Sequence, residues 1–345
     1  MNVLSLFDGL SGGSLALDRL GYKVDNYFAS EIDPYAIAVA KHNFPHIQHI
    51  GSVIDVNPND LPKIDLLIGG SPCQGFSFAG KRKGSSTKTN LDVVSLEQYL
   101  DLKKQGFEFD GQSYLFWEYM RLLEALREKN PDIKFMLENV VMSQKWRTMF
   151  DTAIGTTAIN INSNLVSAQN RKRLYWTNIV VDGQPRDKGI LLYDILETKS
   201  DAPHADFKAE DIIFTKVKPN VQANIIKHHD HIMNTDKTTY IMPVKSDFSD
   251  NKVSITKCIT LRANNSCAYV IDKPNKTYRK LTVTECERLQ TIKDDYTIAP
   301  YNGKNVSETQ RYKMIGNGWT IDVICHLLKN VNKSSETSVD AGFLF

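Results

Sequence analysis

The sequence predicts an α/β protein built on a mainly parallel sheet, and three short stretches carry this prediction. Apolar runs at residues 3–7, 27–30 and 66–68 each end at a glycine-bearing turn or an acidic residue. Helical patterns of apolar residues follow the first two runs, as expected for strand–helix–strand units. In open α/β sheets, ligands bind at the carboxyl ends of the strands. We therefore expect the functional residues to follow these runs.

The first unit has the plan of a nucleotide-binding fold. The run 3–7 is followed by the turn DGLSGG (8–13) and by leucines at helical spacing before Gly21. The strand 27–30 ends in Glu31, and Pro34 opens a helix that extends to about Asn43, because proline is favoured at the first helical position. The spacing is not a strict GxGxxG, so an ordinary tight turn and a helix-end charge at Glu31 remain alternatives. Together, the turn and the acid favour a ligand that contains a nucleoside.

The third run leads to a candidate nucleophile. The sequence DLLIGGSPCQGFS (65–77) places Cys73 directly after Pro72, which restricts both its own backbone and that of Ser71. A thiol at the carboxyl edge of a sheet is suited to covalent catalysis. The alternative is an unreactive buried cysteine, which is common in intracellular proteins.

Further polar residues follow along the chain. Residues 79–112 are polar and long for a structural connection, so we expect a mobile loop over the site; a solvated charge run is the alternative to phosphate contact. A helix is predicted at 114–129 and a strand at 135–137, which delivers Glu138. A buried acid there requires a partner or a raised pKa. Gln169, Arg171 and Arg173 alternate before the strand 174–177 and would share one face, as recognition residues do.

Composition sets the class of protein. The 345 residues are 41% hydrophobic and 24% charged, as in soluble globular proteins, with no stretch of membrane-spanning length and no signal peptide. The five cysteines include no CxxC pair, which argues against a disulfide framework or a zinc ribbon and favours a reducing cytoplasm. His228, His229 and His231 are interpreted as a solvated or phosphate-facing cluster rather than a metal site. The net charge of +2 means that a polyanion would be bound by local basic patches.

Taken together, the motifs resemble those of the cytosine-5 DNA methyltransferases of bacteria and phages. They follow the family's order, with no shared motif in about 185–275. They read FDGLSGG (7–13), SEID (30–33), GGSPCQGFS (69–77), ENV (138–140), QNRKR (169–173), RKLTVTECERLQ (279–290) and GNG (316–318). The resemblance implies a Rossmann-like S-adenosylmethionine-dependent methyltransferase domain from residues 1–184 and 279–331. It also implies a smaller target-recognition domain at 185–278 and a tail at 332–345.

The resemblance assigns roles to four catalytic residues. Cys73 would attack carbon 6 of a cytosine flipped out of duplex DNA, and Glu138 would hold ring nitrogen 3 and the amine. Arg173 would bind the ring carbonyl oxygen, and Arg171 would organise Cys73 and Glu138.

It also implies two sets of binding residues. The S-adenosyl-L-methionine site would comprise Phe7, Gly9, Leu10, Gly12, Glu31, Ile32, Ser52, Val53 and Asn317. The substrate contacts would comprise Gln74, Ser77, Gln169 and Thr260. Two positions depart from the family pattern: Ser52 stands where an aspartate is frequent, and Gly318-Trp319 replace a Ser-Val pair found in many members.

The resemblance implies a monomer that methylates double-stranded DNA in the cytoplasm of a bacterium or a phage-infected cell, without a metal or a membrane. A cognate restriction endonuclease in the same host would fit this activity but is not physically required. Two alternatives stay open. One branch of the family methylates a tRNA cytosine, but its Cys-Phe-Thr motif does not occur here. A catalytically inactive DNA-binding relative would have no need for Cys73, Glu138, Arg171 and Arg173 together.

Overall fold

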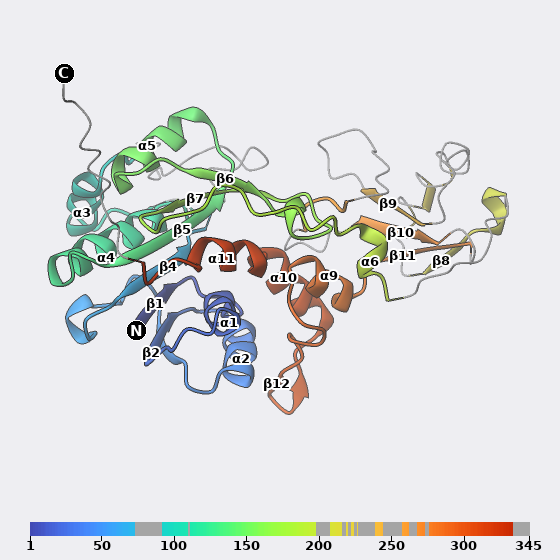
Figure 1. The fold of residues 1–345 in the computed structure, drawn as a ribbon, viewed down its shortest axis with the longest axis horizontal. Helices are drawn as coiled ribbons and strands as arrows, with labels where there is room; N and C mark the ends of the chain where they lie inside the picture. The colour runs from blue at the N-terminus through green and yellow to red at the C-terminus, as the bar shows by residue number, and fades with distance from the viewer. Residues whose placement is uncertain are drawn as a thin grey trace, which may run out of the picture.

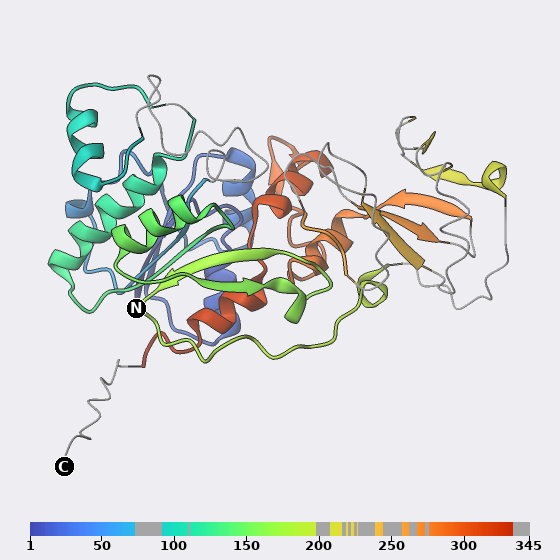
Figure 2. The ribbon, with the colours of Figure 1, turned by 90° about the horizontal axis from the view of Figure 1, so that it is seen from above.

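The computed structural model describes residues 1–72, 92–109, 111–197, 208–215, 219, 222–223, 226, 239–243, 257–261, 268–272 and 276–333. Several residues that the sequence singles out lie outside the described residues: Cys73, Gln74, Ser77, His228, His229 and His231. The chain has a larger part around a seven-stranded sheet and a smaller part, at the other end of the long axis, around a four-stranded sheet (Figures 1 and 2).

The large sheet confirms the predicted α/β class. Its strand order is β3-β2-β1-β4-β5-β7-β6. The first five strands in this order run parallel to one another. The strand β7 pairs antiparallel with both β5 and β6. The bounds are β1 Asn2–Leu6, β2 Asn26–Ser30, β3 Gln48–Gly51, β4 Leu66–Gly70, β5 Lys134–Val140, β6 Ile159–Asn162 and β7 Lys172–Thr177. The order reverses between β1 and β4, so the loops after these two strands flank the crevice where ligands bind in such sheets.

Helices cover both faces of this sheet (Figure 1). One face packs against α1 Gly12–Arg19, α2 Pro34–Asn43 and α11 Ile321–Leu328. The other packs against α3 Leu96–Lys104, α4 Leu115–Lys129 and α5 Gln144–Ile154. Side chains alternate between the two cores along β1, with Val3 in the first core and Leu4 and Leu6 in the second. None of the helices in the described ranges is long and apolar enough to cross a lipid bilayer.

The expectation of a single loop over 79–112 is wrong for its second half, because α3 forms there. Ser95 caps the helix by accepting a hydrogen bond from the Gln98 backbone N–H at 3.1 Å. Tyr99 and Lys103 on α3 both donate to the carboxylate of Glu118, which is fully buried on α4. The helix is therefore fixed by a buried polar contact with another helix.

The second sheet has the order β8-β11-β10-β9. Its strands are β8 Ile213–Thr215, β9 Thr239–Pro243, β10 Ala268–Asp272 and β11 Thr277–Lys280. A third apolar cluster joins this sheet to the larger part through α6 Leu192–Ile195, α9 Val283–Leu289 and α10 Glu308–Asn317. Shorter elements complete the described chain: η1 Pro58–Asp60, η2 Ser163–Leu165, η3 Ala209–Asp211, β12 Pro300–Tyr301 and β13 Lys304–Asn305.

Candidate active site

The turn after β1 is tied to the end of β2. Phe7, Gly9 and Ser11 have φ angles of 57°, 57° and 60°, so the chain turns sharply through left-handed conformations. The Asp8 backbone N–H donates to the Ser30 carbonyl oxygen at 3.1 Å. The Gly9 N–H donates to Glu31 Oε2 at 2.8 Å. The ends of β1 and β2, which the sequence predicted to act together, are therefore connected by hydrogen bonds.

The Glu31 carboxylate is oriented by backbone donors. Besides Gly9, the N–H groups of Ile32 and Asp33 donate to Oε1 at 2.7 and 2.8 Å. A carboxylate has about four acceptor positions, so one on Oε2 stays available for a ligand hydroxyl. Ile32 follows directly with 69% of its surface exposed and offers an apolar face beside this acceptor. An acid and an apolar side chain in this order suit the ribose and the base of a nucleoside.

Asp8, the first residue of the DGLSGG turn, is an acid whose burial the sequence reasoning missed. Its side chain accepts hydrogen bonds from the hydroxyls of Tyr27 and Ser11. Burial raises the pKa of its carboxyl from 3.8 to about 6, against the lowering effect of the Ser11 hydroxyl. The acidic residue in the DGLSGG turn was visible in the sequence, but its burial depends on Tyr27 from the next strand.

The other predicted methyl-donor residues lie in three segments. After β3, the Ser52 hydroxyl accepts from the Ile54 N–H at 3.4 Å, while the carbonyl of buried Val53 accepts from Arg121 at 3.2 Å. In the turn after β1, the carbonyl of Leu10 accepts from the Tyr296 hydroxyl at 2.8 Å.

The segment 317–319 lies beside that turn. A Cβ placed on Gly12 would be 3.5 Å from Trp319 Cε3, and one placed on Gly318 would be 3.4 Å from Leu10 Cδ2. Asn317 ends α10 and is exposed. The segment of the chain near residue 317 therefore packs directly against the turn at residues 8–13, which supports the predicted grouping.

The second half of the site is formed where β4 and β5 end. Gly70 of β4 is paired in register with Glu138 of β5. Glu138 lies within β5, which continues through Val140, rather than directly after a strand that ends at residue 137. Its Oε1 is 2.9 Å from Arg173 Nε on β7. The prediction that a buried acid at this edge needs a partner is therefore confirmed.

Asn139 fixes the segment that leads to Cys73. Its side-chain amide donates to the Ser71 hydroxyl at 3.0 Å and to the Ser71 carbonyl at 3.3 Å, and both residues are buried. The chain thus leaves β4 through an anchored Ser71-Pro72 before it reaches the residue predicted to be the nucleophile. Sequence reasoning used Asn139 only as part of the ENV motif and did not identify this anchoring contact.

The remaining predicted residues do not all reach one surface. Arg171 is buried and donates to the carbonyls of Leu261, Gly316 and Gly318 at 3.2, 3.3 and 2.9 Å. Gln169 is fully buried, accepts from the Leu261 N–H at 2.8 Å and donates to the Leu289 carbonyl at 3.2 Å.

The burial of Gln169 argues against direct contact of its side chain with DNA. Its hydrogen bonds instead connect the chain before β7 to Leu261 and to Leu289. The Thr260 hydroxyl donates to the Asn170 carbonyl at 2.6 Å, so it joins the segment 257–261 to the chain before β7.

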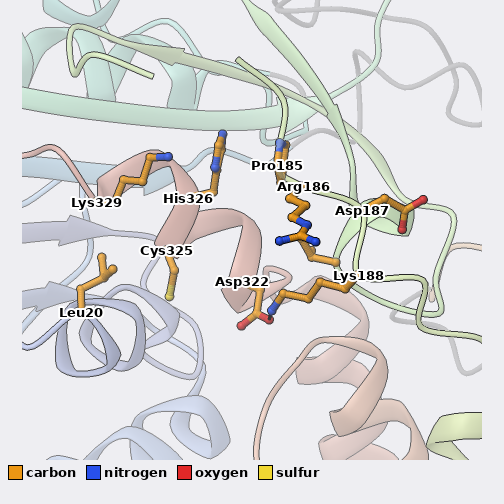
Figure 3. A pocket seen from close by; sticks show the side chains of 10 residues that line it. Leu20, Pro185, Arg186, Asp187, Lys188, Asp322, Cys325, His326 and Lys329 are labelled. Atoms are coloured by element: carbon orange, nitrogen blue, oxygen red, sulfur yellow. Dashed lines mark hydrogen bonds and ion pairs between the residues drawn. The ribbon is translucent and has the colours of Figure 1, made fainter. Parts of the chain in front are cut away.

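An open cavity elsewhere contains none of the predicted site residues. It lies between the residues 185–188 and α11, with Leu20 of the α1 region on another side (Figure 3). Its acid Asp322 is already paired with Lys188 and Arg19. Within the described ranges, no group of three or more His, Cys, Asp or Glu side chains is arranged to hold a metal ion.

Comparison with known proteins gives the family. The chain matches the C-5 cytosine-specific DNA methylase family over residues 1–98 and 101–333. It is 25% identical to the type II methyltransferase M.Bsp6I of Bacillus sp. (strain RFL6), over 97% of this chain and 99% of the relative. It is 24% identical to the type II methyltransferase M.HhaI of Haemophilus parahaemolyticus, over 97% and 95% of the two chains.

A solved structure shares the fold. The S. pombe Dnmt2 methyltransferase superposes with a TM-score of 0.58, covering 96% of this chain and 98% of that chain at 13% identity. At that identity the likeness bears on the fold alone, and it supports the predicted Rossmann-like methyltransferase architecture. The family match spans nearly the whole sequence and agrees with full-length type II relatives. The chain belongs to the C-5 cytosine-specific DNA methylase family and is a DNA cytosine-5 methyltransferase that uses a methyl donor.

Proposed function

We propose that the methyl donor is S-adenosyl-L-methionine and that Cys73, Glu138, Arg171 and Arg173 carry the reaction on a flipped cytosine of duplex DNA. The observation that supports this most directly is the Glu138–Arg173 pair, 2.9 Å apart, at the edge where β4 leads to Cys73. A carboxylate and a guanidinium held side by side match the nitrogen 3, amine and carbonyl edge of cytosine, which presents both a donor and acceptors.

The residues around the turn fit the adenosine part of this donor. The free acceptor position on Glu31 Oε2 suits a ribose hydroxyl, and exposed Ile32 with half-buried Phe7 suits the adenine ring. Ser52 and Val53 from the β3 loop would lie near the base, with Gly9, Leu10, Gly12 and Asn317 toward the methionine part. When bound, the donor supplies an activated methyl group on sulfur.

The chain's own residues would prepare the cytosine. Carbon 5 is a poor nucleophile until a thiolate adds at carbon 6, and Cys73 would form this bond. Glu138 would share a proton with nitrogen 3 as charge builds up on the ring, while Arg173 holds the carbonyl oxygen. Arg171 would hold the backbone of residues 316–318 in place through its hydrogen bonds to the carbonyls of Gly316 and Gly318. After methylation, a base takes the proton from carbon 5, and the electron pair of that C–H bond expels the Cys73 thiolate and restores the aromatic ring.

We further propose which residues form the catalytic domain and which form the target-recognition domain. Residues 1–184 and 279–331 would form the catalytic domain, 185–278 the target-recognition domain and 332–345 a tail. β11 spans residues 277–280 and pairs with β10 and β8, so the chain crosses this proposed boundary within a strand. A duplex DNA substrate fits a monomer acting in the cytoplasm of a bacterium or a phage-infected cell, with or without a cognate restriction endonuclease.

Purified protein tests this proposal with labelled S-adenosylmethionine and two nucleic acids, unmethylated duplex DNA and bulk tRNA. We expect label in DNA and none in tRNA, and no transfer by Cys73→Ser. Cys325→Ser is the matched control, since burial raises the pKa of that thiol to about 11 and makes it a poor nucleophile. Label only in tRNA would contradict the DNA assignment, and full activity of Cys73→Ser would contradict the proposed nucleophile.

A further inference from the structure

Trp319 is a residue whose contacts reach both halves of the site. Its indole Nε1 is 3.2 Å from Glu138 Oε2, while Arg173 Nε is 2.9 Å from the other carboxylate oxygen, Oε1. The same indole packs against Gly12 in the turn after β1, where a Cβ would be 3.5 Å from Cε3. The ring therefore lies between the turn proposed for the methyl donor and the carboxylate proposed for the cytosine.

Gly70 provides the space for this contact. A Cβ built on Gly70 would be 2.9 Å from Glu138 Oε2 and 2.9 Å from Trp319 Nε1. Real Cβ atoms do not approach other atoms this closely, so any side chain at residue 70 would force the indole and the carboxylate apart. The absence of a side chain on Gly70 thus permits the hydrogen bond between two residues that are 181 positions apart in the sequence.

We propose that Trp319 is a positioning residue that fixes the plane of the Glu138 carboxylate for the incoming cytosine. This inference rests on the proposed role of Glu138. The last torsion of a glutamate side chain is broad and roughly twofold, so a contact at one oxygen alone leaves the carboxylate plane free to turn. Arg173 holds Oε1, and Trp319 holds Oε2.

The chemistry of the indole suits this task. An indole N–H donates but does not accept a hydrogen bond, so it holds the carboxylate without exchanging a proton with it. Each carboxylate oxygen keeps a second position, so one oxygen can accept a hydrogen bond from the cytosine amine and the other can share a proton with ring nitrogen 3.

The direct test removes the donor and keeps an aromatic ring. Trp319→Phe should slow single-turnover methylation of a duplex oligonucleotide about tenfold, the lower range for one hydrogen bond to a charged group. The dissociation constant of S-adenosylhomocysteine, measured by calorimetry, and the half-saturating DNA concentration should stay within about twofold. Trp146→Phe is the matched control, because Trp146 lies on α5 in the opposite core and should leave the rate unchanged.

Two further variants test whether the effect passes through Glu138. Gly70→Ala keeps the indole but separates the two groups, so it should give a similar rate loss. In a Glu138→Gln background, Trp319→Phe should cause no further tenfold loss, because the carboxylate it positions is absent.

Three results would overturn the inference. They are a wild-type rate for Trp319→Phe, a loss of S-adenosylhomocysteine affinity as large as the rate loss, and an undiminished effect in the Glu138→Gln background. The second would assign Trp319 to the donor site, and the third would show that its effect does not pass through Glu138. A wild-type protein that methylates no DNA would contradict the proposed function itself, and this outcome is visible before any variant is compared.

Discussion

Asp8 makes the stability of this protein depend on pH in a direction that can be measured. The buried carboxyl has a pKa raised by desolvation from 3.8 to about 6. The protonated form is therefore favoured in the folded state, and its stabilising contribution is complete below pH 3.8 and lost as the pH rises through about 6. At about 1.4 kcal/mol for each tenfold change in proton affinity, the ionised carboxyl costs the folded state about 3 kcal/mol at neutral pH.

Asp8→Asn removes this titration and keeps the shape of the side chain. The amide oxygen can still accept from Tyr27, and the amide nitrogen can donate to the Ser11 hydroxyl, which also accepts. The free energy of unfolding of the variant, minus that of the wild type, should therefore rise by about 3 kcal/mol between about pH 4 and about pH 8.

Urea unfolding followed by circular dichroism at several pH values measures this difference. Comparing the two proteins at each pH cancels the contributions of the other titrating groups. A difference that stays constant with pH would refute the reasoning, because it would mean that Asp8 has the same proton affinity in the folded and unfolded states. A difference that falls as the pH rises would show that its hydrogen bonds outweigh its desolvation.

Three further changes test other contacts. Gly13→Ala places a Cβ 2.2 Å from Ile68 Cδ1 and 2.8 Å from the Tyr27 hydroxyl, so it should lower the free energy of unfolding by about 1–3 kcal/mol. Adding Ile68→Val removes the closer of the two contacts and should recover part of this loss; no recovery would contradict a clash with Ile68 as its cause. Glu118→Ala removes the buried partner of Arg121 and should cost about 3–5 kcal/mol in urea unfolding, and a cost below about 1 kcal/mol would show that the network adds little. Glu31→Ala should weaken S-adenosylhomocysteine binding at least about tenfold in calorimetry, whereas unchanged affinity would remove Glu31 from the donor site.

The strand ends that form the site could be predicted because the pattern there is local. Each element here is predicted by a pattern of about ten residues. This holds for the apolar run of β1, for the turn after it and for the helix that Pro34 opens. The structure confirms β2 to within one residue and α2 over its full predicted length. For the same reason, the contact between the turn and Glu31 follows from the pairing of adjacent parallel strands.

Other features depend on contacts between distant segments, which periodicity does not report. The helix α3 lies in a polar stretch, and the burial of Tyr99 there depends on α4, whose Glu118 accepts a hydrogen bond from the Tyr99 hydroxyl. Alternation predicted that Gln169 and Arg171 share one face, but it does not distinguish a surface facing DNA from one facing α9, where Gln169 lies. The Trp319 contact with Glu138 requires the C-terminal segment to return to the sheet, and only the fold brings the two together.

We propose that Cys73 is the nucleophile with which this chain methylates cytosine in DNA. The most direct test is bisulfite sequencing of DNA from cells that lack other cytosine methylation and express either wild-type protein or Cys73→Ser at matched levels. We predict methylated cytosine at one short sequence motif with the wild type and none with the variant. The same methylation with Cys73→Ser, or no methylated motif with well-folded wild type, would contradict the account.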